Sequence, residues 1–110
     1  MSDASTTVAE LRRIMEHFVA ERNWHRFHSP KNLAMSIAIE AAELMEHFQW
    51  NDNDASRTVA DNPIELQPVA EELADVVCYS LALANELKLD LSTAIREKMK
   101  KNAVKYPPGH

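Results

Sequence analysis

The amino-acid sequence predicts an all-α fold, in which four helices form a bundle that assembles into a homo-oligomer. The chain has 110 residues, of which 45% are hydrophobic and only one is glycine, so turns that require glycine are scarce. Alternating runs of β-branched residues are scarce as well, which disfavours strands. At this length we expect residues 1–110 to form a single domain, with flexible ends at 1–6 and 108–110.

The charge balance excludes several classes of partner. With a net charge of -5, the chain lacks the basic surface that follows a nucleic-acid polymer. No apolar run reaches the roughly 20 residues that cross a bilayer, and the first ten residues do not resemble a signal peptide. The sole cysteine, Cys78, lies in an apolar segment and has no partner for an internal disulfide. These features indicate a cytoplasmic protein without a membrane partner.

The first two helices follow from spacing and capping. Residues 7–23 carry apolar side chains at helical intervals, with charged residues on the opposite face. Ser29 is a suitable N-cap for a second helix, because Pro30 then occupies the first helical position, where its missing N–H costs nothing. We expect this helix to continue to about Trp50.

A polar loop and a long third helix come next. Residues 51–62 are rich in Asn and Asp, which predicts a surface loop. The third helix begins near Pro63 and ends at about Leu87, with Pro68 tolerated only in its first turn or in a separate short turn. Apolar residues spread around this helix, which indicates burial on more than one side and hence self-association: Val69, Leu73, Val76, Val77, Leu81 and Leu83.

The fourth helix covers about Leu91–Val104 and is capped by Asp90 or Ser92. Its end is basic, and cations at a helix C-terminus interact favourably with the macrodipole. If all four helices pack antiparallel to their neighbours, a polar stripe on the last helix faces the acidic residues described next. That stripe consists of Lys98, Asn102 and Lys105.

Two pairs of carboxylates stand in apolar helical segments. Glu40 and Glu43 are three residues apart, as are Glu72 and Asp75, and at about 100° per residue each pair shares one face of its helix. Burying four unpaired carboxylates is costly. A divalent cation reverses that cost because it neutralises them, and oxygen ligands of this kind suit Mg²⁺. The alternative is that these acids form solvated faces.

A short connection ahead of the second helix concentrates aromatic and imidazole groups. Trp24, His25, Phe27 and His28 lie within residues 23–32, where they could stack on a planar ligand and form hydrogen bonds with it. The alternative is that Trp24 and Phe27 only close the end of the bundle.

The acidic pairs favour metal-assisted hydrolysis of a phosphate ester or anhydride. Metal ions hold phosphate oxygens and lower the pKa of a bound water, while a further carboxylate accepts the water's proton. A di-iron site is disfavoured, because it requires Glu-x-x-His pairs and no histidine here lies three residues after a glutamate.

Five motifs together resemble the all-α nucleoside triphosphate pyrophosphohydrolases of the MazG-like superfamily, and among them the dCTP pyrophosphatase branch. They are E-x-x-E at Glu40–Glu43, E-x-x-D at Glu72–Asp75, W-x-x-F-H-x-P-[KR]-N-L at Trp24–Leu33, FQW at Phe48–Trp50, and K-M-x-x-N-x-x-K-Y-P at Lys98–Pro107.

The resemblance implies hydrolysis of a nucleoside triphosphate between its α and β phosphates, with Mg²⁺ or its substitute Mn²⁺. Glu40, Glu43, Glu72 and Asp75 would be the catalytic metal ligands. Aromatic residues would line the base pocket, and the last helix would contact phosphate. The substrate-binding residues implied are Trp24, His28, Lys31, Trp50, Tyr79, Lys98, Asn102, Lys105 and Tyr106. The resemblance also implies a homodimer or homotetramer and a role in removing unwanted nucleotides.

A second hypothesis comes from a different class. The chain would be a catalytically silent helical homo-oligomer that binds a nucleotide or a partner helix, and its acids would pair with Arg and Lys across the interface. Replacement of Glu43 by alanine separates the two hypotheses, because only the enzyme loses turnover while keeping its fold.

Overall fold

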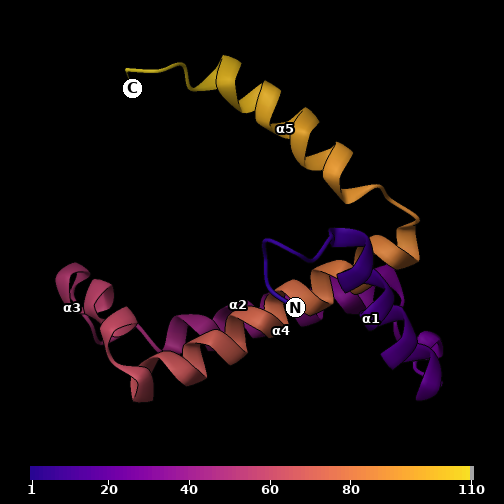
Figure 1. Cartoon of the computed structure of the whole chain (residues 1–110), viewed down its shortest axis with the longest axis horizontal. Helices are drawn as coiled ribbons and strands as arrows, with labels where there is room; N and C mark the ends of the chain where they lie inside the picture. The colour runs from indigo at the N-terminus through magenta and orange to yellow at the C-terminus, as the bar shows by residue number, and fades with distance from the viewer. Residues whose placement is uncertain (110) are drawn as a thin grey trace.

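A computed structural model describes residues 1–109, and this part of the chain contains only helices and turns (Figure 1). The all-α prediction is confirmed, but the helix count of four is wrong, because five α-helices and two 3₁₀ turns are present within 1–109. In chain order they are α1 (Val8–Glu21), η1 (His25–Phe27), α2 (Pro30–Glu46), α3 (Asn53–Thr58), η2 (Val59–Asp61), α4 (Pro63–Leu87) and α5 (Leu91–Lys105).

Side-chain caps fix where the long helices begin. Ser29 accepts a hydrogen bond from the Asn32 N–H at 3.2 Å, and Asp90 accepts one from the Thr93 N–H at 3.0 Å. Both were expected from the sequence, since a short polar side chain satisfies a helix N–H that has no carbonyl partner. Thr7 caps α1 in the same way.

The segment predicted as a loop, residues 51–62, is instead largely helical. Asp52 accepts a hydrogen bond from the Ala55 N–H at 2.7 Å and so starts α3, and η2 follows directly. The second helix is also shorter than predicted, since α2 ends at Glu46. Pro68 lies inside α4 beyond its first turn, contrary to expectation. The helix continues through this position because a proline removes one hydrogen bond, which the long packed segment after it outweighs.

The helices α2 and α4 lie side by side and antiparallel, joined at one end through α3, and α1 packs on α4 near the other end (Figure 1). The small core holds Val19 of α1, Leu33 of α2 and Leu81 of α4, each at most 5% exposed. This packing fixes two long helices against each other and leaves their outer faces open.

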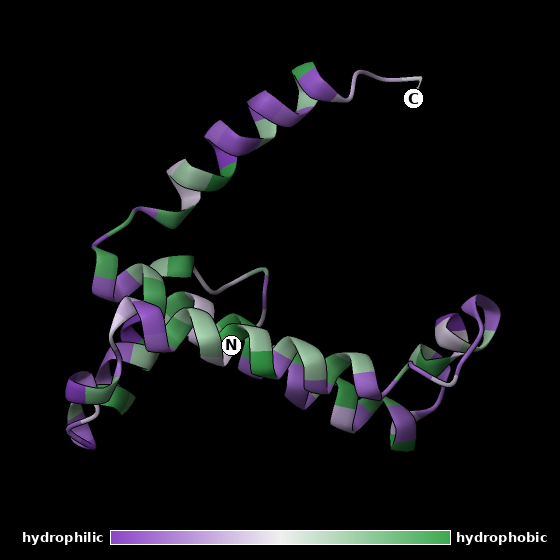
Figure 2. Cartoon of the chain, turned by 180° about the vertical axis from the view of Figure 1, so that it is seen from behind, coloured by the Kyte–Doolittle hydropathy of each residue, from purple (hydrophilic) through white to green (hydrophobic). Residues whose placement is uncertain are grey.

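The last helix does not complete a bundle within the chain. After α4, Lys88 adopts a left-handed backbone conformation with φ of 52°, and α5 then runs away from the other helices (Figure 1). The expected antiparallel four-helix packing is therefore wrong for the single chain. The physical reason lies in α5 itself, which carries a narrow apolar stripe among charged residues (Figure 2). Ile95 and Met99 of that stripe are 53% and 58% exposed.

No helix within residues 1–109 has both the length and the apolar character that a membrane crossing requires. At the N-terminus, the Ser5 N–H donates to the Ser2 carbonyl at 3.1 Å and closes a turn. The flexibility expected for 1–6 and 108–109 stays a prediction, and that expected for His110 lies outside the described residues.

Candidate active site

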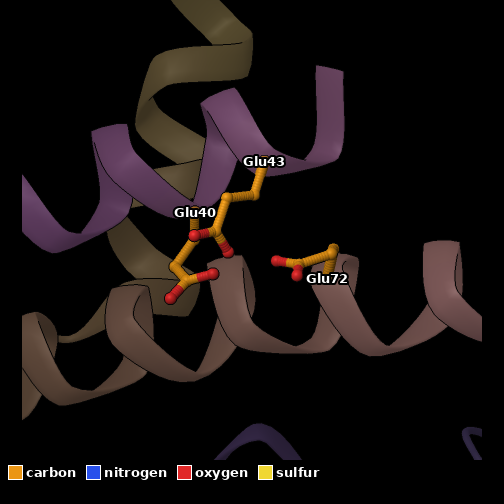
Figure 3. Close-up of side chains that lie close together, drawn as sticks. All are labelled: Glu40, Glu43 and Glu72. Carbon is orange, nitrogen blue, oxygen red and sulfur yellow. The ribbon is translucent and has the colours of Figure 1, made fainter. Parts of the chain in front are cut away.

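Three of the four predicted acids converge where α2 faces α4. Glu40 and Glu43 extend from α2 and Glu72 from α4, and their carboxylates point toward one another (Figure 3). One carboxylate oxygen of each lies within 4.8 Å of the others. All three side chains are half-buried. We call these residues the acid cluster.

Within residues 1–109, the acid cluster forms no ion pair with a basic side chain. In addition, Glu40 Oε2 and Glu72 Oε2 are buried without a hydrogen-bond partner. Buried carboxylate oxygens are normally paired, because leaving them unpaired has a high desolvation cost. Oxygen-rich clusters of this kind are typical binding sites for hard divalent cations.

Crowding of negative charge changes the acidity of the cluster. The nearby carboxylate of Glu43 is the largest cause that raises the pKa of Glu40, followed by burial and by the nearby carboxylate of Glu72. Together they raise that pKa from its ordinary value of 4.5 to about 7. A bound cation would reverse this effect, because it stabilises the ionised carboxylates.

Asp75 is not part of the converging group. It is exposed, one helical turn after Glu72 on α4, and lines a neighbouring cavity instead. Tyr79 is one turn farther along α4 and lines the same cavity as Asp75. Burial is the largest cause that raises its pKa, followed by the charges of Glu40 and Asp75. The expected contact of Tyr79 with the substrate stays a prediction.

The cavity beside the acid cluster has a volume of about 430 Å³ and a mainly apolar wall. We call it the side cavity. Pockets of this size accept small planar ligands. Its lining comes from α1, from the connection that holds η1, and from α4: Ile14, Met15, Phe18, Val19, Trp24, His28, Asp75, Cys78 and Tyr79.

Aromatic rings in the side cavity form a continuous series. Phe18 and Trp24 pack edge to face with ring centroids 5.5 Å apart, and Trp24 is 6.1 Å from His28. The His28 ring is in turn 6.4 Å from that of Tyr79. His28 Nδ1 is buried without a partner, so it is available to a ligand. Of the residues that the sequence singled out, Trp24, His28 and Tyr79 thus share one cavity.

Other predicted site residues lie elsewhere in the chain. Trp50 is 89% exposed and does not line the side cavity. Lys31 is exposed in the first turn of α2. The residues expected to contact phosphate are on or just after α5, which stands apart from α2 and α4 (Figure 1). These are Lys98, Asn102, Lys105 and Tyr106.

Some residues of the site were not found from the sequence. Ile14, Met15 and Phe18 line the side cavity, although their spacing indicates only an ordinary amphipathic helix. Cys78 also lines it, and burial followed by the charge of Asp75 raises the pKa of its thiol. Phe18 is 40% exposed, which is unusual for a large aromatic residue on the apolar face of a helix, and the sequence gives no indication of this exposure.

Comparison with known proteins identifies related chains. Residues 35–110 match the MazG-like family. Over 101 residues, the chain is 39% identical to dCTP pyrophosphatase 1 of Bos taurus and 40% identical to that of Mus musculus. These matches cover 92% of this chain, which spans about 60% of the length of the curated relatives.

A solved structure has the same fold. The crystal structure of a pyrophosphatase from Archaeoglobus fulgidus DSM 4304 superposes with a TM-score of 0.84 at 39% sequence identity. The superposition covers 97% of this chain and 98% of that one. The open arrangement of helices therefore has a close counterpart in a crystal.

Proposed function

This chain belongs to the MazG-like family, and on that basis we propose that it is a Mg²⁺-dependent nucleoside triphosphate pyrophosphohydrolase. Its substrate would be dCTP or a modified dCTP, since curated relatives at about 40% identity are named dCTP pyrophosphatase 1. The products would be the nucleoside monophosphate and pyrophosphate. Such a reaction removes unwanted nucleotides from the pool, and we propose that it takes place in the cytoplasm.

The observation that carries this proposal is the acid cluster beside an aromatic cavity. A nucleotide has a planar base at one end and a polyanion at the other. The side cavity, with Trp24 and His28 in its wall, suits the base, and the cluster suits a cation that accompanies the phosphates. Glu72, Asp75 and Tyr79 follow one another along α4, and the last two line the side cavity. This helix therefore contributes to both regions.

The residues present fit Mg²⁺. Glu40, Glu43 and Glu72 offer only oxygen donors, and two of their oxygens are buried without partners. Asp75, one turn farther along α4, is the fourth ligand in our proposal, on the strength of the family motif. Mn²⁺ would substitute because it accepts the same donors. When bound, the ion would neutralise phosphate charge and lower the pKa of a water molecule.

The protein's own groups would orient the triphosphate for attack. A water oxygen forms the new bond to the α phosphorus, the bond to the α–β bridging oxygen breaks, and pyrophosphate leaves with that oxygen. A carboxylate of the site accepts the water's proton. Trp24 and His28 hold the base, which keeps the α phosphorus next to the carboxylates.

The exposed apolar surface supports self-association, and we propose that the active form is a homodimer or homotetramer. On α2 and α4, Ile39, Met45 and Leu73 are 57%, 70% and 51% exposed, and the stripe on α5 is uncovered as well (Figure 2). Exposed large apolar side chains that gather on the same helices are typical of an interaction site. Lys98, Asn102 and Lys105 would then contact phosphate from a neighbouring copy or after α5 packs differently.

The test is a panel of ribo- and deoxynucleoside triphosphates, incubated with and without Mg²⁺, with the products resolved by chromatography. We expect monophosphate and pyrophosphate, only with metal, and fastest for one base. Diphosphate and phosphate would contradict the proposed position of attack. Absence of turnover for every nucleotide would overturn the enzyme assignment and favour the silent homo-oligomer.

A further inference from the structure

One histidine outside the acid cluster and the side cavity is held between two carboxylates. His25 is in η1, and its Nε2 lies 2.8 Å from Glu16 Oε1 on α1. Its Nδ1 lies 2.8 Å from Glu86 Oε1 on α4. A single side chain therefore connects the η1 segment to both helices.

The two short distances bear on the protonation state of the His25 ring. A neutral imidazole carries one N–H, so it can donate to only one of the two carboxylates, and its bare nitrogen would face the lone pairs of the other. An imidazolium has two N–H groups and donates to both. Charge-assisted hydrogen bonds of this type are stronger than neutral ones. The arrangement thus favours the protonated ring.

Within residues 1–109, no Lys or Arg forms an ion pair with Glu16 or Glu86. Arg12 is one turn before Glu16, but its Nε donates to Asn85 Oδ1 at 2.9 Å and its Nη2 to the Ala84 carbonyl at 3.2 Å. Glu16 and Glu86 are the charged groups that act on His25 from the elements packed around it. The hydrogen bond with Glu86 is the largest cause that raises the pKa of His25, and Glu16 adds to it, while partial burial opposes both.

The other polar contacts of this segment are local in sequence. The Trp24 N–H donates to the Val19 carbonyl at 3.0 Å, and Asn32 Nδ2 donates to the Phe27 carbonyl at 3.1 Å. The turn between α1 and η1 passes through Asn23 at φ 59°, a conformation that asparagine tolerates. Within residues 1–109, His25 is the only residue of this segment that forms a hydrogen bond with α4.

We propose that His25 is a positioning residue that, as an imidazolium, clamps the η1 segment onto α1 and α4 and so sets how tightly the side cavity binds a nucleotide base. This inference rests on the proposed function for its substrate. Trp24 and His28 flank η1 and both line the cavity. Loss of one of the two His25 hydrogen bonds would loosen the η1 segment, whose two flanking residues form part of the wall of the side cavity. Because α4 also carries Glu72, the clamp ties the base-binding wall to the helix of the acid cluster.

The clamp makes binding depend on pH with a definite sign. A group whose pKa is raised by folding stabilises the folded state fully at a pH below its ordinary pKa, which is 6.5 for histidine. That stabilisation is lost as the pH rises through the raised pKa. Base binding should therefore weaken as the pH rises through the raised pKa of His25.

The experiment combines kinetics and NMR on the full chain with Mg²⁺ and dCTP. We expect the KM of the wild type to rise roughly three- to tenfold on going to high pH, with kcat following a separate profile, since ordering a few side chains has about this effect. His25→Gln should have the high KM at every pH, because glutamine donates to only one carboxylate. Glu86→Gln should restore a low KM at high pH, since its amide donates to the bare ring nitrogen.

His17→Gln is the matched control. His17 also contacts a carboxylate, Glu21 at 3.0 Å, but within α1 alone, so its removal should leave the KM profile unchanged. A His25→Gln profile that coincides with the wild type would overturn the clamp, and so would an equal change in the His17→Gln control.

The NMR readout separates the clamp from the proposed function. In the metal-free protein, the His25 ring signals should titrate above 6.5, and the Trp24 indole signal should shift with the same midpoint. In Glu86→Gln the midpoint should fall. A His25 midpoint at or below 6.5 overturns the inference, whether or not any nucleotide is hydrolysed.

Discussion

The helix pair α2–α4 and the helix α5 differ in how far contacts within a single chain bury their apolar residues and bring their site residues together. The pair buries Leu33 and Leu81 and brings three carboxylates within 4.8 Å. The last helix leaves Ile95 and Met99 more than half exposed and holds its polar stripe away from those acids. One region is assembled by contacts within the chain, whereas the other still lacks a partner surface.

This difference indicates which residues can be tested in isolation. In our proposal, metal binding by the acid cluster requires only α2 and α4, which pack against each other. Any phosphate contact from Lys98 or Lys105 requires α5 to meet another surface. Variants in the two regions should therefore fail in different ways, one in chemistry and the other in assembly.

The largest effect is expected for Glu43→Gln, which keeps the size of the side chain and removes one charge from the acid cluster. Turnover should fall by at least about 100-fold, because a ligand of the ion is lost, while the helix content stays unchanged. The measurement is steady-state hydrolysis alongside circular dichroism. Glu46→Gln, exposed on the same helix, is the control that should retain activity. Equal activity of the two variants would remove Glu43 from the site.

A smaller effect should follow from breaking the stripe on α5. Ile95→Asp combined with Met99→Asp should convert the proposed homo-oligomer into monomers and lower kcat/KM by about tenfold, since buried apolar anchors dominate interfaces. Light scattering after size exclusion reports the mass. The control is Lys101→Asp, a charge change on an exposed residue of the same helix. If the double variant keeps the mass and the rate of the wild type, α5 is not an interface.

The acid cluster should also make stability depend on metal and pH. The folded state raises the pKa of Glu40 to about 7, so it binds a proton more readily than the unfolded chain. Without metal, the contribution of Glu40 to stability is therefore complete below about pH 4.5. That contribution is lost as the pH rises through about 7. At pH 8, Mg²⁺ should raise Tm. A free Mg²⁺ concentration of 100 times Kd adds about 2.7 kcal/mol to the free energy of unfolding.

Glu40→Gln should weaken this dependence of stability on metal and pH. Without metal at pH 8 its Tm should exceed that of the wild type, because one crowded charge is gone, and Mg²⁺ should add less. Differential scanning fluorimetry compares the two proteins. A wild type that is insensitive to Mg²⁺, or a variant that melts lower without metal, would contradict the crowding of charge at this site.

The smallest contrast is between the two tryptophans. Trp24 lines the side cavity, whereas Trp50 is 89% exposed in the single chain. Trp24→Ala should raise KM by about tenfold, since stacking on a base contributes about 1–3 kcal/mol. Trp50→Ala should change KM by less, and a change as large as that of Trp24→Ala would mean that assembly brings Trp50 to the base.

Capping and spacing made the long helices predictable. Ser29 with Pro30, and Asp90, begin their helices where the sequence indicated, because a cap depends on a few neighbouring residues. Glu40 and Glu43 share a helix face for the same local reason. The convergence of Glu72 with them was also expected, since apolar faces bring α2 and α4 together.

Two kinds of feature were missed. A polar composition indicated a loop at 51–62, although the local cap at Asp52 begins α3 there. The position of α5 depends on the turn at Lys88 and, in our proposal, on the surface of another copy, and periodicity reports neither. The side-chain bridge of His25 joins positions 9 and 61 residues away in sequence, so no local pattern reveals it.

The most direct test of the central claim, that the acid cluster holds Mg²⁺ for attack at the α phosphorus, is ³¹P NMR of dCTP mixed with the wild type and with Glu43→Gln. We expect the wild type with Mg²⁺ to produce pyrophosphate and dCMP signals together, and the variant to leave dCTP intact. Inorganic phosphate with dCDP, or equal pyrophosphate release by both proteins, would contradict the claim.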